Sequence, residues 1–406
     1  SVLFNDYTYT NIATDGIIQK RAFNGSLSIK DPNINFISNI EVDFKTAKPK
    51  FNSVGDLQNT NLKKLGFTNK DIQLTGLLDI NFEGDSIDNF IGYAKFYNGK
   101  LKGEQSVVSF DSVTLHSSIE KGIKYLRLAS DDINANIYGK FNISHLPASV
   151  QYFMQSYLPT YIPAPKSTPT NQLFDIQIKT NYFEPYIRIF RNEFSGFNNL
   201  NFKGSINTDK KTIQFKALVP FAQWNQMAIT RGDFDGNGTK DSLILAIKSG
   251  SFNLTDSFQF INPVISIHTI NDKSNIEIDA YSNNALQRLH LKGIANTFSD
   301  GLSLSWEPSY FILNQKKWDI DKGGELSLRK SNTYAKNLRF SQGIQEFIFR
   351  NGIKNAIQLE LKNVILGDLT KLFFSYPSLE GITNGKIQFN DVLENLVVQS
   401  DLKIDQ

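Results

Sequence analysis

The chain has 406 residues, of which 40% are hydrophobic and 12% aromatic, and its 43 basic side chains nearly balance its 40 acidic ones. This balance gives no electrostatic reason to expect a nucleic-acid partner. The absence of cysteine excludes disulfides, thiol catalysis and cysteine-ligated zinc or iron–sulfur sites. No apolar run approaches the length of about 18 residues that a membrane-spanning helix needs. Because the chain opens on Ser1 and closes on a strand-like run, we expect both ends to cut through a longer protein.

Short runs that alternate apolar and polar residues dominate the chain. In chain order, clear examples are Leu78–Glu83, Phe174–Lys179, Asn275–Asp279 and Ile357–Lys362. Successive side chains of a strand point to opposite faces, so each run predicts a strand with one apolar and one polar face. Antiparallel sheets show this one-sided pattern, whereas buried parallel sheets do not. Glycine-led strands and short polar turns recur at irregular spacing, which indicates a long meander.

Three stretches depart from this pattern and predict short helices at 55–66, 147–158 and 366–376. The second leads into a proline-rich stretch, which is the one position where the sequence suggests a boundary. We therefore expect a sheet segment over 1–160, a proline-rich connection over 161–172, and a second sheet segment over 173–406 that continues the same groove.

No recognisable catalytic motif is present. The four histidines are isolated from one another, and alternation within its strand places His290 on the polar face. The chain also lacks the glycine-rich signatures of phosphate-binding and dinucleotide-binding loops. These observations predict a protein that is not an enzyme.

The sharpest local motif is an acidic, glycine-rich stretch between two predicted strands. Its oxygen-bearing side chains have the spacing of a calcium loop: Asp233, Asp235, Asn237, Thr239 and Asp241. We expect a hairpin tip that folds around one structural calcium ion. The alternative is an ordinary turn without metal, because Asp, Asn and Gly favour turns in any case.

The apolar faces have two possible uses. Two faces can bury each other in a closed sandwich, or one face can line an open groove for an apolar ligand, and periodicity does not separate these structures. The length of the chain without domain breaks favours the groove. Its predicted lining residues are Leu78, Ile80, Phe82, Phe174, Ile176, Ile178, Ile276, Ile278, Leu359, Leu361, Ile387 and Phe389.

Several stretches together resemble the TamB family of the Bacteroidota. They are residues 16–36, residues 57–66, and residues 368–389 near the end of the chain. The resemblance covers most of the chain and rests on the number and order of strand–turn units. The acidic stretch at 233–241 is not part of the family pattern.

The resemblance implies both a fold and a function. TamB-like proteins are anchored in the inner membrane, cross the periplasm and end beside a BamA-like outer-membrane barrel protein. Their C-terminal part is a long, curved, mainly antiparallel sheet that forms an open half-pipe, the β-taco, with an apolar interior and few helices. We therefore expect an all-β segment that conducts phospholipid between the two membranes or assists outer-membrane protein assembly. The alternative is a structural or adhesive surface protein built from closed β-sandwich domains that calcium stabilises.

Overall fold

A computed structural model describes residues 1–104, 106–255, 258–282, 285–352, 356–370 and 380–405. Strands hold 65% of the described residues and helices 6%. The strands form a large antiparallel sheet, and the predicted curved, all-β fold is confirmed. No helix among the described residues is both long and apolar enough to cross a membrane.

Backbone contacts divide the chain into two units. Unit 1 consists of residues 1–149, 169–211 and 215–225, and unit 2 consists of residues 150–168, 212–214 and 226–406. This division does not follow the proline-rich stretch. Residues beyond that stretch return to unit 1, where Leu173–Thr180 pairs along its whole length with the strand that precedes the helix.

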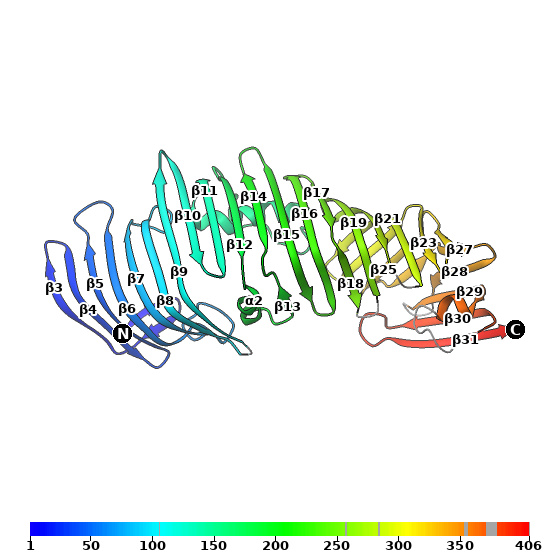
Figure 1. The fold of residues 1–406 in the computed structure, drawn as a ribbon, viewed down its shortest axis with the longest axis horizontal. Helices are drawn as coiled ribbons and strands as arrows, with labels where there is room; N and C mark the ends of the chain where they lie inside the picture. The colour runs from blue at the N-terminus through cyan, green and yellow to red at the C-terminus, as the bar shows by residue number, and fades with distance from the viewer. Residues whose placement is uncertain (105, 256–257, 283–284, 353–355, 371–379, 406) are drawn as a thin grey trace. The chain divides into compact units, whose positions relative to one another are not determined.

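Unit 1 is a meander in which most strands pair with the next strand along the chain. Figure 1 shows β3 to β12 side by side in chain order, and register is continuous from β3 to β12. The strands are β1 (Val2–Phe4), β2 (Tyr7–Tyr9), β3 (Ile12–Gln19), β4 (Ala22–Asp31), β5 (Ile34–Asp43), β6 (Lys50–Asn61), β7 (Gln73–Glu83), β8 (Ile91–Lys102), β9 (Val107–Glu120), β10 (Ile123–Ser130), β11 (Ile133–Lys140), β12 (Leu173–Thr180), β13 (Phe194–Gly196) and β14 (Asn201–Asn207). The next strand, β15 (Thr212–Trp224), contributes residues to both units.

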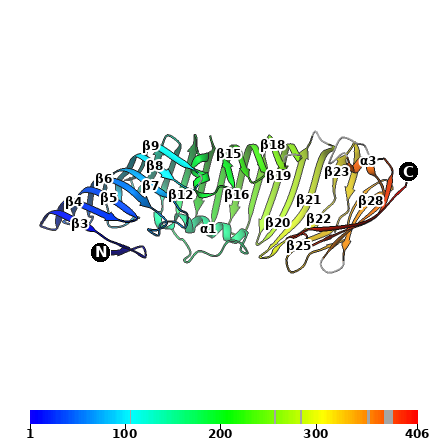
Figure 2. The same ribbon diagram turned by 90° about the horizontal axis from the view of Figure 1, so that it is seen from below.

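Unit 2 continues with antiparallel pairs and then branches. Strand β21 pairs with β22 through its second half and with β23 through its first half. Figure 2 shows β19 to β22 side by side. The strands are β16 (Met227–Thr239), β17 (Leu243–Lys248), β18 (Ser251–Thr255), β19 (Phe258–Ile270), β20 (Lys273–Tyr281), β21 (Leu286–Phe298), β22 (Gly301–Trp306), β23 (Ser309–Leu313), β24 (Lys316–Ile320), β25 (Glu325–Arg329), β26 (Tyr334–Lys336), β27 (Leu338–Gln342), β28 (Gln345–Asn351), β29 (Ile357–Ile365), β30 (Ile382–Asn390) and β31 (Val397–Asp405).

The helices agree only in part with the sequence. Helix α1 (Leu146–Tyr157) follows a short 3₁₀ turn, Ile143–His145, and confirms the prediction at 147–158. Helix α3 (Leu366–Thr370) covers the start of the predicted helix at 366–376, and residues 371–376 lie outside the described residues. Helix α2 (Glu184–Phe190) was not predicted, and its Ile189 packs in a small buried cluster with Ile72 and Val108.

The helix predicted at 55–66 is wrong. Residues up to Asn61 belong to β6, which pairs with β5 on one side and with β7 on the other. Beyond Asn61 the chain makes a turn whose Gly66 has φ +77°, a conformation that glycine adopts readily. Pairing on both edges satisfies the backbone hydrogen bonds of this stretch and outweighs its local helical spacing.

Within unit 1, the β1–β2 hairpin is fastened to the main sheet by the carboxylate of Asp31 at the end of β4. That carboxylate accepts hydrogen bonds from the Tyr7 hydroxyl, from the Thr10 backbone N–H at 2.9 Å and from the Thr10 hydroxyl at 2.7 Å. The backbone N–H of Asn33 also donates to it, at 2.9 Å. Burial alone would raise the pKa of Asp31, but these hydrogen bonds favour the charged form and lower its pKa to about 2.

We expect Asp31→Asn to lower the melting temperature of the protein at neutral pH, because an amide accepts these hydrogen bonds less well than a carboxylate. A lowered folded-state pKa contributes stability that is present above the unfolded pKa of about 3.9 and is lost as the pH falls through the folded pKa. The gap between parent and variant should therefore close as the pH drops from about 4 toward 2. Melting curves at a series of pH values measure this, and a gap that stays constant down to the lowest pH would contradict it.

Candidate functional site

The register of unit 1 lines up apolar side chains in rows that run across the strands. One row, here called the Ile80 row, crosses from β7 to β14 through directly opposed residues. It consists of Ile80, Ala94, Leu115, Leu128, Ala135, Ile178 and Phe202. A parallel row joins Phe82 to Ile176 through Gly92, Ser117, Leu126 and Ile137. Two of the predicted lining segments therefore share one apolar face, although β7 and β12 lie far apart in the sequence.

The opposite face of the same strands is polar. The residues next to the Ile80 row are Asn81, Tyr93, His116, Arg127, Asn136, Gln177 and Lys203, each opposed to the next across the sheet. Because side chains alternate between faces, a one-residue slip in any strand would place charges on the apolar face. The alternation of the sequence thus fixes which face can accept an apolar ligand.

Unit 2 carries an equivalent face. Its row joins Phe234, Ile247, Ile265, Ile278 and Leu291 across β16, β17, β19, β20 and β21. Ile276, the other predicted lining residue of β20, lies opposite Ile267 in the neighbouring row.

The exposure of the predicted lining residues separates them into two groups. Ten of the twelve are half-buried, whereas Phe174 and Leu361 are only 4% and 3% exposed. In a closed sandwich, facing aliphatic side chains are almost completely buried. Half-buried Ile and Leu side chains over so many strands leave apolar surface available to a ligand.

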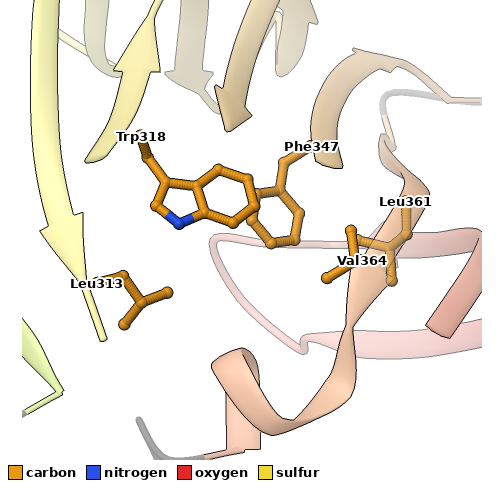
Figure 3. Close-up of a cluster of buried hydrophobic side chains, with 5 residues drawn as sticks. All are labelled: Leu313, Trp318, Phe347, Leu361 and Val364. Atoms are coloured by element: carbon orange, nitrogen blue, oxygen red, sulfur yellow. The ribbon is translucent and has the colours of Figure 1, made fainter. Parts of the chain in front are cut away.

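At the end of unit 2 the face is closed by packing. Leu361 belongs to a buried cluster with Leu313, Trp318, Phe347 and Val364, drawn in Figure 3. The rings of Trp318 and Phe347 stack with centroids 4.7 Å apart. Leu359 and Ile387, also predicted to line the groove, pack against this cluster. In this structure Leu361 is part of a core, and Leu359 and Ile387 are half-buried against it.

The acidic stretch of unit 2 is a strand and not the predicted hairpin tip. Residues 233–239 belong to β16, and Asp233, Asp235 and Asn237 lie opposite Lys248, Ala246 and Ile244 of β17. Alternate residues of a strand are about 6.8 Å apart, twice the rise per residue. Calcium needs its oxygen ligands within about 2.3–2.6 Å of one centre, so this conformation does not gather the five predicted ligands around one ion.

The glycines of this stretch have a different role. Gly236 and Gly238 are buried on the face opposite the acidic side chains, and the end of α1 approaches β16 at Gly238. The Tyr157 hydroxyl donates a hydrogen bond to the carbonyl of Thr239, and a Cβ at Gly238 would collide with that hydroxyl. Burial raises the pKa of Tyr157, so the hydroxyl stays protonated and able to donate. Beyond α1, Thr160 donates to the carboxylate of Asp272, which holds the segment against the β19–β20 turn.

A second polar cluster lies on the outer face of β20 and β21. Glu277, Asp279 and His290 bring their ligand atoms within 4.8 Å of one another. His290 contacts Asp279 at 2.9 Å, while Lys292 and Arg288 form ion pairs with Glu277 and Asp279 at 2.8 and 3.7 Å. Since both carboxylates already face cations, the arrangement is that of a cross-strand charge ladder. His290 lies among polar partners, as its place in the alternation predicts.

Comparisons of the chain with protein-family models, with curated proteins and with solved structures found no match. The features that bear on function are therefore the apolar faces of the two units and the polar faces behind them.

We expect Gly238→Ala to destabilise the protein by about 1–3 kcal/mol, because the added methyl group must displace Tyr157 or the strand. Tyr157→Phe keeps the ring and loses one hydrogen bond, so its expected cost is smaller, about 1 kcal/mol. Urea unfolding of both variants measures this. If Tyr157 is the cause of the clash, Gly238→Ala should cost much less in a Tyr157→Ala background.

Calcium binding at the acidic stretch stays a prediction, and it would require β16 to rearrange. If calcium binds there, Asp235→Ala should lower the melting temperature in calcium buffer and leave it unchanged in chelator. A calcium titration of the parent protein that releases no heat and does not shift the melting temperature would favour the metal-free strand.

Proposed function

We propose that this chain is a segment of a periplasmic bridge that carries phospholipid between the inner and outer membranes of a Gram-negative bacterium, in the manner of the TamB family. The observation that carries the proposal is the pair of apolar faces, whose Ile, Leu and Phe side chains remain half-buried. An acyl chain laid on such a face would remove these side chains from water, with a gain of about 0.8 kcal/mol per buried CH₂ group.

The polar face supports the same function. Its Asn, Gln, Arg and Lys side chains keep the outside of the sheet in contact with water, so the protein needs no membrane around it to stay folded. A phospholipid could then rest its acyl chains on the apolar face and project its head group into solvent. The resemblance to the TamB family supplies the expected surroundings: a membrane anchor outside this chain and a BamA-like barrel at the outer membrane.

The experiment places one charge on each face of the same strand. Ile178 is half-buried in the Ile80 row, and its neighbour Lys179 is exposed on the polar face. We expect mass spectrometry of lipid extracted from the purified parent protein and from Lys179→Asp to find phospholipid. Ile178→Asp should remain folded and lose most of that lipid, because burying an unpaired carboxylate beneath an acyl chain costs several kcal/mol.

Circular dichroism and melting curves accompany the lipid measurement. Unfolding of Ile178→Asp would instead indicate that the face is a sandwich core, which belongs to the competing function of a structural or adhesive β-protein. Absence of lipid from the parent protein would also contradict the bridge. The buried cluster around Trp318, at the end of unit 2, favours closed packing there.

A further inference from the structure

Unit 1 contains an apolar pocket on its apolar face. Its volume is about 490 Å³, and its lining includes Phe44, Phe51, Phe82, Ile87, Phe90 and Leu115. Ligand-binding pockets typically measure about 300–1,000 Å³ and are lined mainly by hydrophobic and aromatic side chains. The volume of this pocket lies within that range, and its lining is likewise mainly aromatic and aliphatic.

Small and large side chains together create this hollow. Ala94 lies in the Ile80 row between Ile80 and Leu115, and its methyl group leaves space that a larger side chain would fill. Phe51 and Phe82 stand beside this space with stacked rings, their centroids 4.8 Å apart. Phe44 and Phe90 add edge contacts to them at 6.0 and 6.1 Å.

Two loops form the walls. The β5–β6 loop contributes Phe44 and Pro49, and the β7–β8 loop contributes residues 84–87 and Phe90. Hydrogen bonds to Asp88 anchor the second loop. The carboxylate of Asp88 accepts one from the backbone N–H of Ser144 at 2.9 Å and one from the Ser144 hydroxyl at 2.6 Å. The buried Lys124 ammonium also donates to the carbonyl of Asp88. A wall that is fixed before the ligand arrives lowers the entropic cost of binding.

The rim of the pocket is rich in lysine. Lys45 and Lys48 lie in the loop between the lining residues Phe44 and Pro49. Lys45 faces Asp43 at 3.6 Å, and this pair is exposed and long. Exposed ion pairs contribute little to stability, so the Lys45 ammonium can turn toward an anionic head group at small cost. Asp85 also lines the pocket, but its carboxylate accepts a hydrogen bond from Asn89.

We propose that this pocket binds the end of one acyl chain whose anionic head group stays at the lysine-rich rim. The volume suits this ligand, since it would hold on the order of fifteen groups of the size of a water molecule, for which the share of liquid volume is about 30 Å³. The proposal rests on the proposed function and deepens it. It adds a saturable site that holds one acyl chain per protein molecule. This site lies on the apolar face along which lipid moves in the proposed function.

The test fills the pocket and uses a matched control from the same row. Ala94 and Ala135 are both half-buried alanines of the Ile80 row, but only Ala94 lines the pocket. A fluorescent long-chain fatty acid is titrated into the parent protein, Ala94→Phe and Ala135→Phe. We expect one equivalent to saturate the parent, Ala94→Phe to weaken binding at least about tenfold, and Ala135→Phe to change it less than about twofold.

Ile87→Asp provides a second variant that does not depend on repacking the sheet. Ile87 is 55% exposed in the β7–β8 loop, so a charge there should leave the fold intact while opposing the acyl chain. Weaker binding by this variant supports the pocket even if Ala94→Phe fails to fold. If both Ile87→Asp and a folded Ala94→Phe bind as the parent does, the pocket is not the site.

The head group is tested separately. The methyl ester of the same fatty acid should bind the parent at least about threefold more weakly than the acid, and Lys48→Glu should weaken binding of the acid by a similar factor. Equal binding of acid and ester would overturn the anionic head group. A competition between the fatty acid and a single-chain anionic phospholipid shows whether a carboxylate or a phosphate is the preferred head.

The outcomes distinguish this inference from the proposed function. Equal losses in Ala94→Phe and Ala135→Phe would overturn the discrete pocket, while lipid on the parent protein and its loss in Ile178→Asp would keep the apolar face as a lipid surface. If no acyl probe binds the parent and no lipid accompanies it on purification, both proposals fail.

Discussion

The structure depends on antiparallel backbone pairing between strands that are near neighbours in the sequence. Each strand satisfies its N–H and C=O groups through the strands beside it, as β7 does between β6 and β8. Because pairing also fixes register, it decides which side chains stand opposite one another. The rows of apolar residues in each unit are a direct consequence of this constraint.

This way of folding leaves most of the apolar side chains half-buried. An ordinary domain gains much of its stability by burying such side chains in a core, and among the described residues the clusters around Trp318 and around Ile72 are small and local. The long ladders of hydrogen bonds and the packing of neighbours within each row supply stability instead. The remaining exposed apolar surface is where the proposed acyl ligand would bind.

Small residues determine where this face changes character. Gly238 lets α1 approach β16 so closely that the Tyr157 hydroxyl donates a hydrogen bond to the strand backbone. Ala94 leaves a hollow in a row whose neighbours are Ile80 and Leu115. The space left by the small side chain is occupied differently at the two positions. Tyr157 fills it beside β16, whereas the space beside Ala94 remains open as a pocket.

The sequence by itself determined the fold class, the alternation of the faces and helix α1, because these depend on the periodicity of apolar residues within short segments. Pairing between strands repeats the same alternation across the sheet. Only the tertiary structure decided the rest. Residues 55–61 form a strand because two neighbours pair with them, and Asp233–Gly238 are extended because β17 pairs with them. Leu361 is buried by Trp318 and its neighbours, and the pocket beside Ala94 exists because two loops fold over the face. Contacts between residues distant in the chain leave no periodic signal in the sequence, and so alternation alone could not predict them.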